Sequence, residues 1–211
     1  MSTLFWISTS CVLSFAAGFF VYAMVNLRRR SPALEAAPGT ETVSRENALR
    51  DEVTGLYNRR HLLQRIEENM ARCKRENLRM AMILWDVDGF VDFNNSFGQS
   101  EGDQLLKKLA DMIKKAVRVY DEAFRSGPDE FCAMLIPGDE TMAAEVDRRV
   151  TQFVSKELFE NDAAYADRSF SLSAGMVFYP GDYELPEAML HAVGQALYLN
   201  RKQRAEAARP A

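Results

Sequence analysis

The sequence predicts an α/β sandwich in which helices cover both faces of a mostly antiparallel sheet. From Arg45 onward, segments with apolar residues at helical spacing alternate with short apolar runs typical of strands. Their order along the chain is helix, strand, helix, hairpin, helix, strand, helix. Such an alternation, with a hairpin in its middle, favours a single sheet packed against helices.

Composition limits what the chain can be. Its 211 residues suffice for one sizeable domain and an extra segment. The formal net charge of -4 gives no general reason to expect a nucleic-acid partner, and we expect none. Cys11, Cys73 and Cys132 are isolated in the sequence, so we expect neither a disulfide framework nor a zinc site.

The beginning of the chain has the composition of a membrane anchor. Residues 4–27 carry no charged side chain, and a span of the hydrocarbon core takes roughly 20 helical residues. Three arginines follow directly, and positive flanks stay on the cytoplasmic side. A signal peptide would have a basic residue before a shorter apolar core, and a buried helix is the remaining alternative. We predict an anchor with its basic stop over residues 1–30 and a cytoplasmic remainder.

The first half of the domain contains a helix and a buried strand. Residues 31–44, rich in Pro, Ala and Thr, are expected to form a linker. Residues 58–77 repeat apolar side chains at helical spacing. Residues 79–88, "RMAMILWDVD", form a continuous apolar run that ends in two acids, as expected of a strand buried on both faces.

The middle of the domain contains an amphipathic helix and a hairpin. Apolar residues recur along one face of residues 101–120, which predicts the helix. Two short strands are expected at residues 122–126 and 130–136, joined by a Gly-Pro turn.

The last part of the domain is expected to add a helix, a strand and a closing helix. These elements cover residues 139–158, the alternating segment 169–180, and residues 185–203, where Pro186 lies at the start of the helix. The domain is therefore assigned to residues 45–205 and a short tail to residues 206–211.

Two pairs of acids lie next to predicted strand ends. Asp86 and Asp88 close the buried strand, and Asp129 and Glu130 occupy the hairpin turn. Residues two apart on a strand face the same side, so these carboxylates could converge on one Mg²⁺ ion, which prefers oxygen ligands. Such a site would stabilise charge on a transferred phosphoryl group. The alternative is that these acids are solvated turn residues.

Several ordered motifs resemble those of GGDEF-domain diguanylate cyclases. "DEVTGLYNRR" matches the opening motif of that family, and "DVDGFVDFNNSFGQSEGD" resembles its acidic block. "FRSGPDEF" lies where the family has R-x-G-G-D-E-F, and "SLSAGMVFYP" and "ALYLNR" resemble later elements. The resemblance covers about residues 45–204 and implies a nucleotide-cyclase-like palm domain.

The resemblance also implies an activity and its residues. The family condenses two GTP molecules into cyclic di-GMP across a dimer. By analogy, Asp86, the Val87 carbonyl and Asp129 would bind Mg²⁺. Glu130 or Asp129 would assist deprotonation of the attacking ribose hydroxyl.

Binding of GTP would involve three further positions. By the same analogy, Asn94 and Asp103 would read the guanine edge, and Arg201 would keep a positive charge near the triphosphate.

Departures from the family pattern favour an inactive domain. Val91 and Ala205 stand where the family has basic residues, and Pro128 replaces the second glycine of the family's signature. Proline fixes φ and removes a backbone donor where the family's chain passes close to the nucleotide. Three more positions differ from the family pattern, namely Asn95, Gln99 and Gly194.

A second family site is better retained. "RVYD" matches the R-x-x-D inhibitory motif, which in the family binds cyclic di-GMP, and it places Arg118 and Asp121 at the family's offset from the signature. A guanidinium can meet a phosphate or a guanine acceptor, and a carboxylate can accept from guanine N–H groups. A local salt bridge is the alternative. Arg148 or Arg149 could add a further cation, and the sequence does not distinguish them.

Together these features predict a degenerate GGDEF protein of the bacterial inner (cytoplasmic) membrane that acts as a cyclic di-GMP receptor or regulator. Its partners would be cyclic di-GMP and either a second copy or another protein. A weak cyclase that uses GTP and Mg²⁺, and a module that binds no nucleotide, remain as alternatives.

Overall fold

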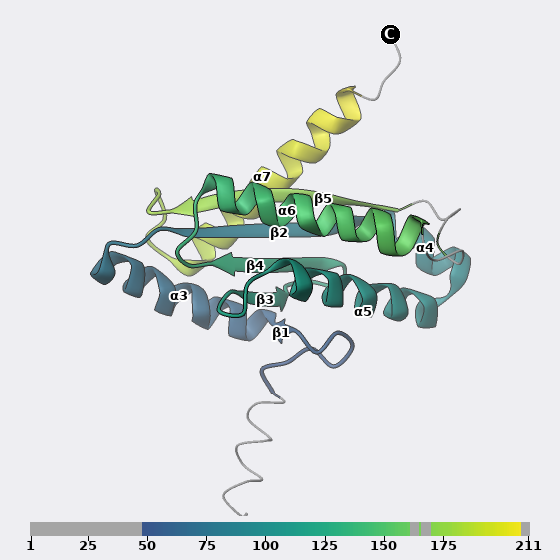
Figure 1. The fold of residues 1–211 in the computed structure, drawn as a ribbon, viewed down its shortest axis with the longest axis horizontal. Helices are drawn as coiled ribbons and strands as arrows, with labels where there is room; N and C mark the ends of the chain where they lie inside the picture. The colour runs from purple at the N-terminus through teal and green to yellow at the C-terminus, as the bar shows by residue number, and fades with distance from the viewer. Residues whose placement is uncertain (1–47, 161–164, 166–169, 208–211) are drawn as a thin grey trace, which may run out of the picture. The chain divides into compact units, whose positions relative to one another are not determined.

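The computed structural model describes residues 48–160, 165 and 170–207 (Figure 1). The chain divides into two units at Glu46, and all described residues belong to the second unit. The predicted anchor and linker lie outside the described residues. Within the described part of the chain, no helix has both the length and the apolar character of a membrane span.

One five-stranded sheet forms the centre of the domain, in the order β1-β3-β4-β2-β5. Its strands are β1 (Tyr57–Asn58), β2 (Met80–Asp88), β3 (Glu122–Arg125), β4 (Glu130–Leu135) and β5 (Ser171–Tyr179). Three of the four pairings are antiparallel, and the short β1 runs parallel to β3. The prediction of a mostly antiparallel sheet is confirmed, whereas β1 was not predicted.

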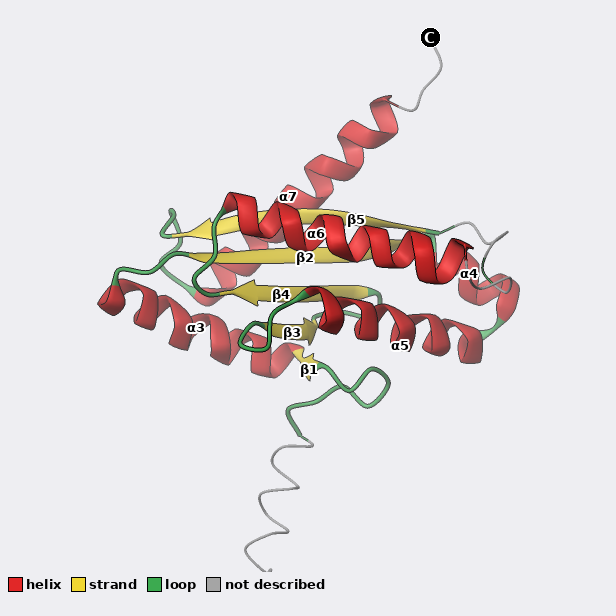
Figure 2. Ribbon diagram, in the orientation of Figure 1, coloured by secondary structure: helices red, strands yellow, loops and turns green. Residues whose placement is uncertain are grey.

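Helices cover both faces of the sheet (Figure 2). The helices are α3 (Arg59–Glu76), α4 (Phe90–Phe97), α5 (Gln99–Ala116), α6 (Glu140–Val154), continued by a π-helical turn (Ser155–Glu160), and α7 (Pro186–Ala207). Figure 1 shows α5 and α6 on the near side of the sheet and α7 behind it. The helix α7 extends two residues into the predicted tail.

The central strand β2 explains why its sequence is apolar without a break. Ala81, Ile83 and Trp85 pack into the cluster under α4, α5 and α6. Met82 and Leu84 pack into the opposite cluster, under α3 and α7. Successive side chains of a strand point to opposite faces, so a strand covered on both sides is apolar at every position. The two acids at its end point toward the α7 side.

The helix α5 ends earlier than the sequence predicted. Val117 is extended, with φ -84° and ψ 161°, which stops the helix at Ala116. Arg118 and Asp121 then close a separate turn, in which the Asp121 N–H donates to the Arg118 carbonyl at 3.1 Å. The "RVYD" segment is therefore a loop rather than the last turn of the helix. Tyr120, assigned to its apolar face, is exposed.

Candidate functional site

The ends of β2 and β4 bring the predicted acids together. Asp86 pairs with Glu130 across the antiparallel ladder. One residue further, the Val87 N–H donates to the Asp129 carbonyl at 3.1 Å. Asp86 therefore lies at the same end of the sheet as Asp129 and Glu130, although it precedes them by more than 40 residues in the sequence. Of the two predicted acidic pairs, Asp86 lies beside Glu130 and Asp129, whereas Asp88 binds Arg201 and two serines.

Arg201 of α7 binds both acids of β2. Its Nη2 lies 2.6 Å from Asp86 Oδ1, and its Nε lies 2.6 Å from Asp88 Oδ1. Nη2 also forms an ion pair with Asp88. The second oxygen of Asp88 accepts hydrogen bonds from the hydroxyls of Ser171 and Ser173, each at 2.7 Å. Asp88 is thus held from β5 and from α7.

Burial and charge shift the pKa values of these two acids in opposite directions. Burial raises the pKa of Asp86 to about 6, with Arg201 opposing the shift and Asp129 adding to it. Burial acts in the same sense on Asp88, but the bonds from Ser171, Ser173 and Arg201 outweigh it and lower the pKa of Asp88. Asp88 is therefore the more firmly ionised partner of Arg201.

The donors around Asp86 suit Mg²⁺ by their chemistry. Asp86, Asp129 and the Val87 carbonyl offer only oxygen atoms, which is what a small hard cation prefers. The Val87 N–H bond to the Asp129 carbonyl and the pairing of Asp86 with Glu130 place these residues close together. No group of three or more His, Cys, Asp or Glu side chains suited to a metal occurs in the described part of the chain. Mg²⁺ would therefore depend on two carboxylates and one carbonyl, with water or a ligand completing its shell.

Arg125 binds backbone carbonyls of the Gly-Pro turn in the signature motif. Its Nη2 donates to the Pro128 carbonyl at 2.6 Å, and its Nε to the Gly127 carbonyl at 3.2 Å. Its Nη1 lies 3.0 Å from Asp51, in the "DEVTGL" loop. The Glu130 side chain packs against this turn, as shown by the 2.7 Å that would separate a Cβ added at Gly127 from Glu130 Oε2. The turn at Pro128 is therefore well anchored, and two of its carbonyls point toward Arg125.

The two predicted guanine-reading residues lie on neighbouring helices. Asn94 belongs to α4, and Asp103 lies in the second turn of α5, which starts at Gln99 rather than at the predicted residue 101. A Cβ at Gly102 would lie 1.8 Å from Asn94 Oδ1, so only glycine leaves room for this side chain. Asn94 Oδ1 is buried and has no hydrogen-bond partner among the described residues.

Two of the positions that depart from the family pattern, Val91 and Ala205, are exposed to solvent. Val91, at the start of α4, is 67% exposed, so its isopropyl group faces solvent where the family has a lysine. Ala205 lies on the exposed end of α7. At Gly194, an added Cβ would meet open space, so no packing requirement explains the glycine.

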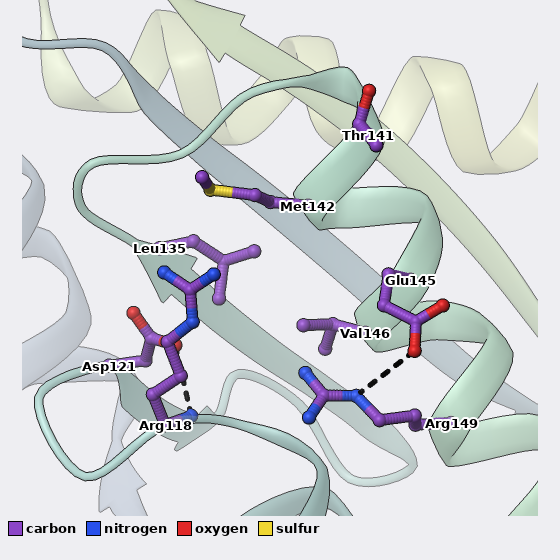
Figure 3. Close-up of a pocket in the computed structure, with 8 residues that line it drawn as sticks. All are labelled: Arg118, Asp121, Leu135, Thr141, Met142, Glu145, Val146 and Arg149. Atoms are coloured by element: carbon purple, nitrogen blue, oxygen red, sulfur yellow. Dashed lines mark hydrogen bonds and ion pairs between the residues drawn. The ribbon is translucent and has the colours of Figure 1, made fainter.

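The "RVYD" turn opens onto a pocket on the α6 side of the sheet (Figure 3). The pocket has a volume of about 160 Å³. Arg118 and Asp121 approach it from the turn, and Arg149 approaches it from α6. Its other walls come from β4 and α6: Leu135, Thr141, Met142, Glu145 and Val146. Of the two arginines that the sequence did not distinguish, Arg149 lines the pocket, whereas Arg148 binds Glu145 at 2.7 Å and does not line it.

Polar groups in this pocket lack partners. Asp121 Oδ2 accepts from the Arg118 N–H at 3.0 Å, but Oδ1 is buried without a hydrogen bond of good geometry. Arg149 Nε is also buried and lacks a hydrogen bond, its nearest acid being Glu145 at 3.9 Å. The Arg118 guanidinium binds the Tyr120 hydroxyl at 3.0 Å. The alternative of a local Arg118–Asp121 salt bridge is not what the structure shows.

Burial raises the pKa of Asp121, although Arg118, the N–H of Ile136 and Arg149 all lower it. A buried carboxylate oxygen that accepts no hydrogen bond is costly, and so is a buried guanidinium N–H without an acceptor. The pocket therefore brings the side chains of Arg118, Asp121 and Arg149 to one hollow. A ligand that carries N–H groups and acceptor oxygens would suit these charged groups.

Sequence reasoning missed three contributors to these sites. Ser171 and Ser173 anchor Asp88, and their alternation in "SLSAG" placed them on one face without indicating their partner. Arg125 was noted only as part of the signature. The sequence indicated that the helix after the hairpin could supply a further cation, but it did not distinguish Arg149 from Arg148.

Comparison with known proteins identifies the family. Residues 48–207 match the family described as "Diguanylate cyclase, GGDEF domain". The probable diguanylate cyclase DgcJ of Escherichia coli K12 is 33% identical over 149 residues, which are 71% of this chain and 27% of that relative. The diguanylate cyclase DosC of the same strain is 30% identical over 77% of this chain, which again spans only 35% of the relative. The chain therefore corresponds to about a third or less of these relatives.

A solved structure shares the fold. The GGDEF domain of DgcB from Caulobacter crescentus, solved in complex with c-di-GMP, has a TM-score of 0.67 at 21% identity and covers 74% of this chain and 91% of its own. The matched profile covers most of the described domain, and the strands and helices have the arrangement of that fold. The chain belongs to the GGDEF domain family.

Proposed function

We propose that this chain is a degenerate GGDEF protein that binds cyclic di-GMP through Arg118, Asp121 and Arg149 and does not synthesise it. The observation that carries the proposal is the pocket itself, which Arg118 and Asp121 of the turn line together with Arg149 of α6. In the predicted GTP site, by contrast, Asp86 and Asp88 are bound to Arg201.

The chemistry of the pocket suits a guanine nucleotide. A guanidinium can donate two parallel hydrogen bonds to a phosphate or to the acceptor edge of guanine, and Asp121 can accept from guanine N–H groups. Met142 and Val146 provide apolar surface for the face of a base. Neutral small molecules without acceptors would leave Arg149 unsatisfied.

A second hollow adjoins the first and fits a ligand with two bases. It has a volume of about 230 Å³ and also borders on Arg118 and Asp121, while Arg50 and Lys114 add positive charge. A cyclic dinucleotide carries two bases and two phosphates, so one half could occupy each hollow. The similar domain of DgcB was solved with c-di-GMP, which supports this class of ligand.

The weakness of the GTP site argues against catalysis. Val91 and Ala205 remove two charges at the phosphate positions. Two charge-assisted contacts at roughly 1.5–3 kcal/mol each correspond to a loss of about 10²- to 10⁴-fold in triphosphate affinity. Pro128 replaces a flexible glycine in the signature turn.

Titration calorimetry with cyclic di-GMP on the full-length chain tests the receptor function. We expect binding to the wild type and a roughly 10- to 100-fold weaker affinity for Arg118→Ala. Arg72→Ala serves as the control, because Arg72 is an exposed arginine of α3 that pairs with Glu76. The absence of wild-type binding would contradict the proposal.

A weak diguanylate cyclase is the second candidate, because Asp86, Asp129 and Glu130 still converge at one edge of the sheet. This function requires Mg²⁺ and GTP. Incubating the chain with both and looking for cyclic di-GMP separates the candidates, with Asp129→Ala as the control. Product that depends on Asp129 would establish the enzyme.

The surroundings of the domain belong to the same proposal. Residues 4–27 would anchor the chain in the bacterial inner membrane, with the domain in the cytoplasm, and membrane fractionation with a protease-protection assay tests this.

A similar structure, diguanylate cyclase SiaD of Pseudomonas aeruginosa, was solved with its activator SiaC. We propose that a second copy or a partner protein receives the signal. If a nucleotide-independent module is correct instead, Arg118→Ala and Asp129→Ala should both leave the phenotype unchanged.

A further inference from the structure

We infer that the guanidinium of Arg201 binds Asp86 in the absence of nucleotide and competes with a divalent metal ion for the Asp86 carboxylate. This inference concerns the acidic edge of the sheet and does not depend on cyclic di-GMP binding at Arg118.

The first support is the position of the charge. Arg201 Nη2 lies 2.6 Å from Asp86 Oδ1, within the range of a charge-assisted hydrogen bond. A Mg²⁺ ion would bind a carboxylate oxygen at about 2.1 Å, so on Oδ1 it would lie within about 5 Å of Nη2. Two cations that close repel each other strongly in a partly buried site. Asp86 therefore binds either the guanidinium or the metal ion strongly, but not both at once.

The second support is the anchor that keeps Arg201 in place. Asp88 binds Arg201 through Oδ1, and Oδ2 is fixed by the hydroxyls of Ser171 and Ser173. Arg201 consequently contacts two carboxylates, and one of them is itself immobilised by β5. Asp88 is thus a positioning residue, which holds the guanidinium next to Asp86.

The third support is that arginine suits this place better than a flexible point charge. A guanidinium offers Nε and Nη2 in a fixed fork, and here Nε binds Asp88 while Nη2 binds Asp86 as well as Asp88. Among the described residues, Arg201 is the only side chain that forms an ion pair with Asp86. Without it, a half-buried carboxylate beside Asp129 would have no local countercharge.

Binding of Mn²⁺ to the nucleotide-free, full-length chain tests the inference. Mn²⁺ takes the same oxygen ligands as Mg²⁺, and its free concentration is measured directly by electron paramagnetic resonance. We expect Arg201→Gln to bind Mn²⁺ roughly 10- to 100-fold more tightly than the wild type, because a charged competitor has been removed. The gain should disappear in the double variant Arg201→Gln, Asp86→Asn.

Arg204→Gln is the matched control. Arg204 lies on the same helix and also reaches β5, where its Nη1 donates to the Leu172 carbonyl at 3.0 Å. We expect its Mn²⁺ affinity to equal that of the wild type. Equal affinities of Arg201→Gln and the wild type, or a loss in Arg201→Gln, would overturn the inference.

A measurement on the wild type covers the case in which Arg201→Gln fails to fold. The Nε–H resonance of Arg201 should be protected from solvent exchange without metal, since it donates to Asp88. It should move or broaden as Mg²⁺ saturates the chain. A resonance unchanged at Mg²⁺ saturation, or one that is unprotected from the start, would show that Arg201 and the metal do not compete.

Discussion

The two sites of this domain differ in how their charged side chains are bound. At the end of β2, the single guanidinium of Arg201 binds both Asp86 and Asp88, and two serine hydroxyls complete the bonding of Asp88. In the "RVYD" pocket, Asp121 Oδ1 and Arg149 Nε are buried without a hydrogen bond, and the acid nearest Arg149 Nε is Glu145 at 3.9 Å.

Both sites derive from one family pattern, so retention of acidic and basic residues alone does not distinguish them. What distinguishes them is where their hydrogen bonds go. A site whose polar groups bind one another is stable without a ligand, whereas a site with unsatisfied groups gains stability when a ligand supplies the missing partners. The pocket at Arg118 is accordingly the better candidate for a site still in use.

Restoring the missing cations should have the largest effect, and it would reduce the difference between the sites. We expect the double variant Val91→Lys, Ala205→Arg to bind GTP in the presence of Mg²⁺ about 10²- to 10⁴-fold more tightly than the wild type, because two charge-assisted phosphate contacts return. Titration calorimetry measures it. Leu199→Arg, which adds a charge to an exposed position of α7, is the control. An unchanged GTP affinity would mean that missing charge is not what weakens this site.

Removing one cation from the pocket should have the next largest effect. We expect Arg149→Ala to weaken cyclic di-GMP binding roughly 10- to 100-fold, since a guanidinium aimed at the ligand is lost. Arg148→Ala should change the affinity less than about twofold, because exposed ion pairs such as Arg148–Glu145 contribute little. Equal losses in the two variants would show that α6 acts through general charge rather than through Arg149.

The fold could be predicted from the sequence largely because helices and strands leave periodic patterns. The apolar run of β2 and the amphipathic α5 were placed to within a few residues. The end of α5 was not, because Val117 leaves the helical conformation although Tyr120 continues the apolar spacing. The short β1 escaped prediction because two residues carry no periodicity.

The candidate sites were predictable where chemistry followed local spacing. Asp86 and Asp88 share a face because they are two residues apart on one strand. The ion pair between Asp88 and Arg201 joins residues separated by 113 positions, and only the packing of α7 against β5 brings them together. Partners of this kind depend on tertiary structure, so no local pattern could have indicated them.

The anchor of Asp88 offers a smaller effect, on stability rather than on ligand binding. Ser173 is 3% exposed, whereas Ser171 is open to solvent, although both hydroxyls donate to the same oxygen. We expect Ser173→Ala to lower the free energy of unfolding by about 1–2 kcal/mol, because Asp88 loses a buried donor that water replaces poorly. Ser171→Ala should cost about 0.5 kcal/mol or less. Urea denaturation measures both values, and a larger loss in Ser171→Ala would contradict the assignment.

The smallest expected effect is a pH dependence that arises in the pocket. Burial raises the pKa of Asp121 above its ordinary value of 3.8, so folding favours the protonated carboxyl. Its contribution to the stability of the ligand-free chain is therefore fully present below pH 3.8 and is lost as the pH rises through the raised value. Because the carboxyl is only half-buried, we expect a change on the order of 1 kcal/mol or less.

Cyclic di-GMP binding should show the opposite trend with pH, because only the ionised carboxylate can accept hydrogen bonds from guanine at both oxygens. The affinity should fall as the pH is lowered toward the raised pKa of Asp121. Titrations between pH 8 and pH 5 with the wild type and Asp121→Asn measure the effect, and the variant should be the less sensitive to pH. Parallel pH profiles of the two proteins would show that Asp121 does not contact the ligand as a carboxylate.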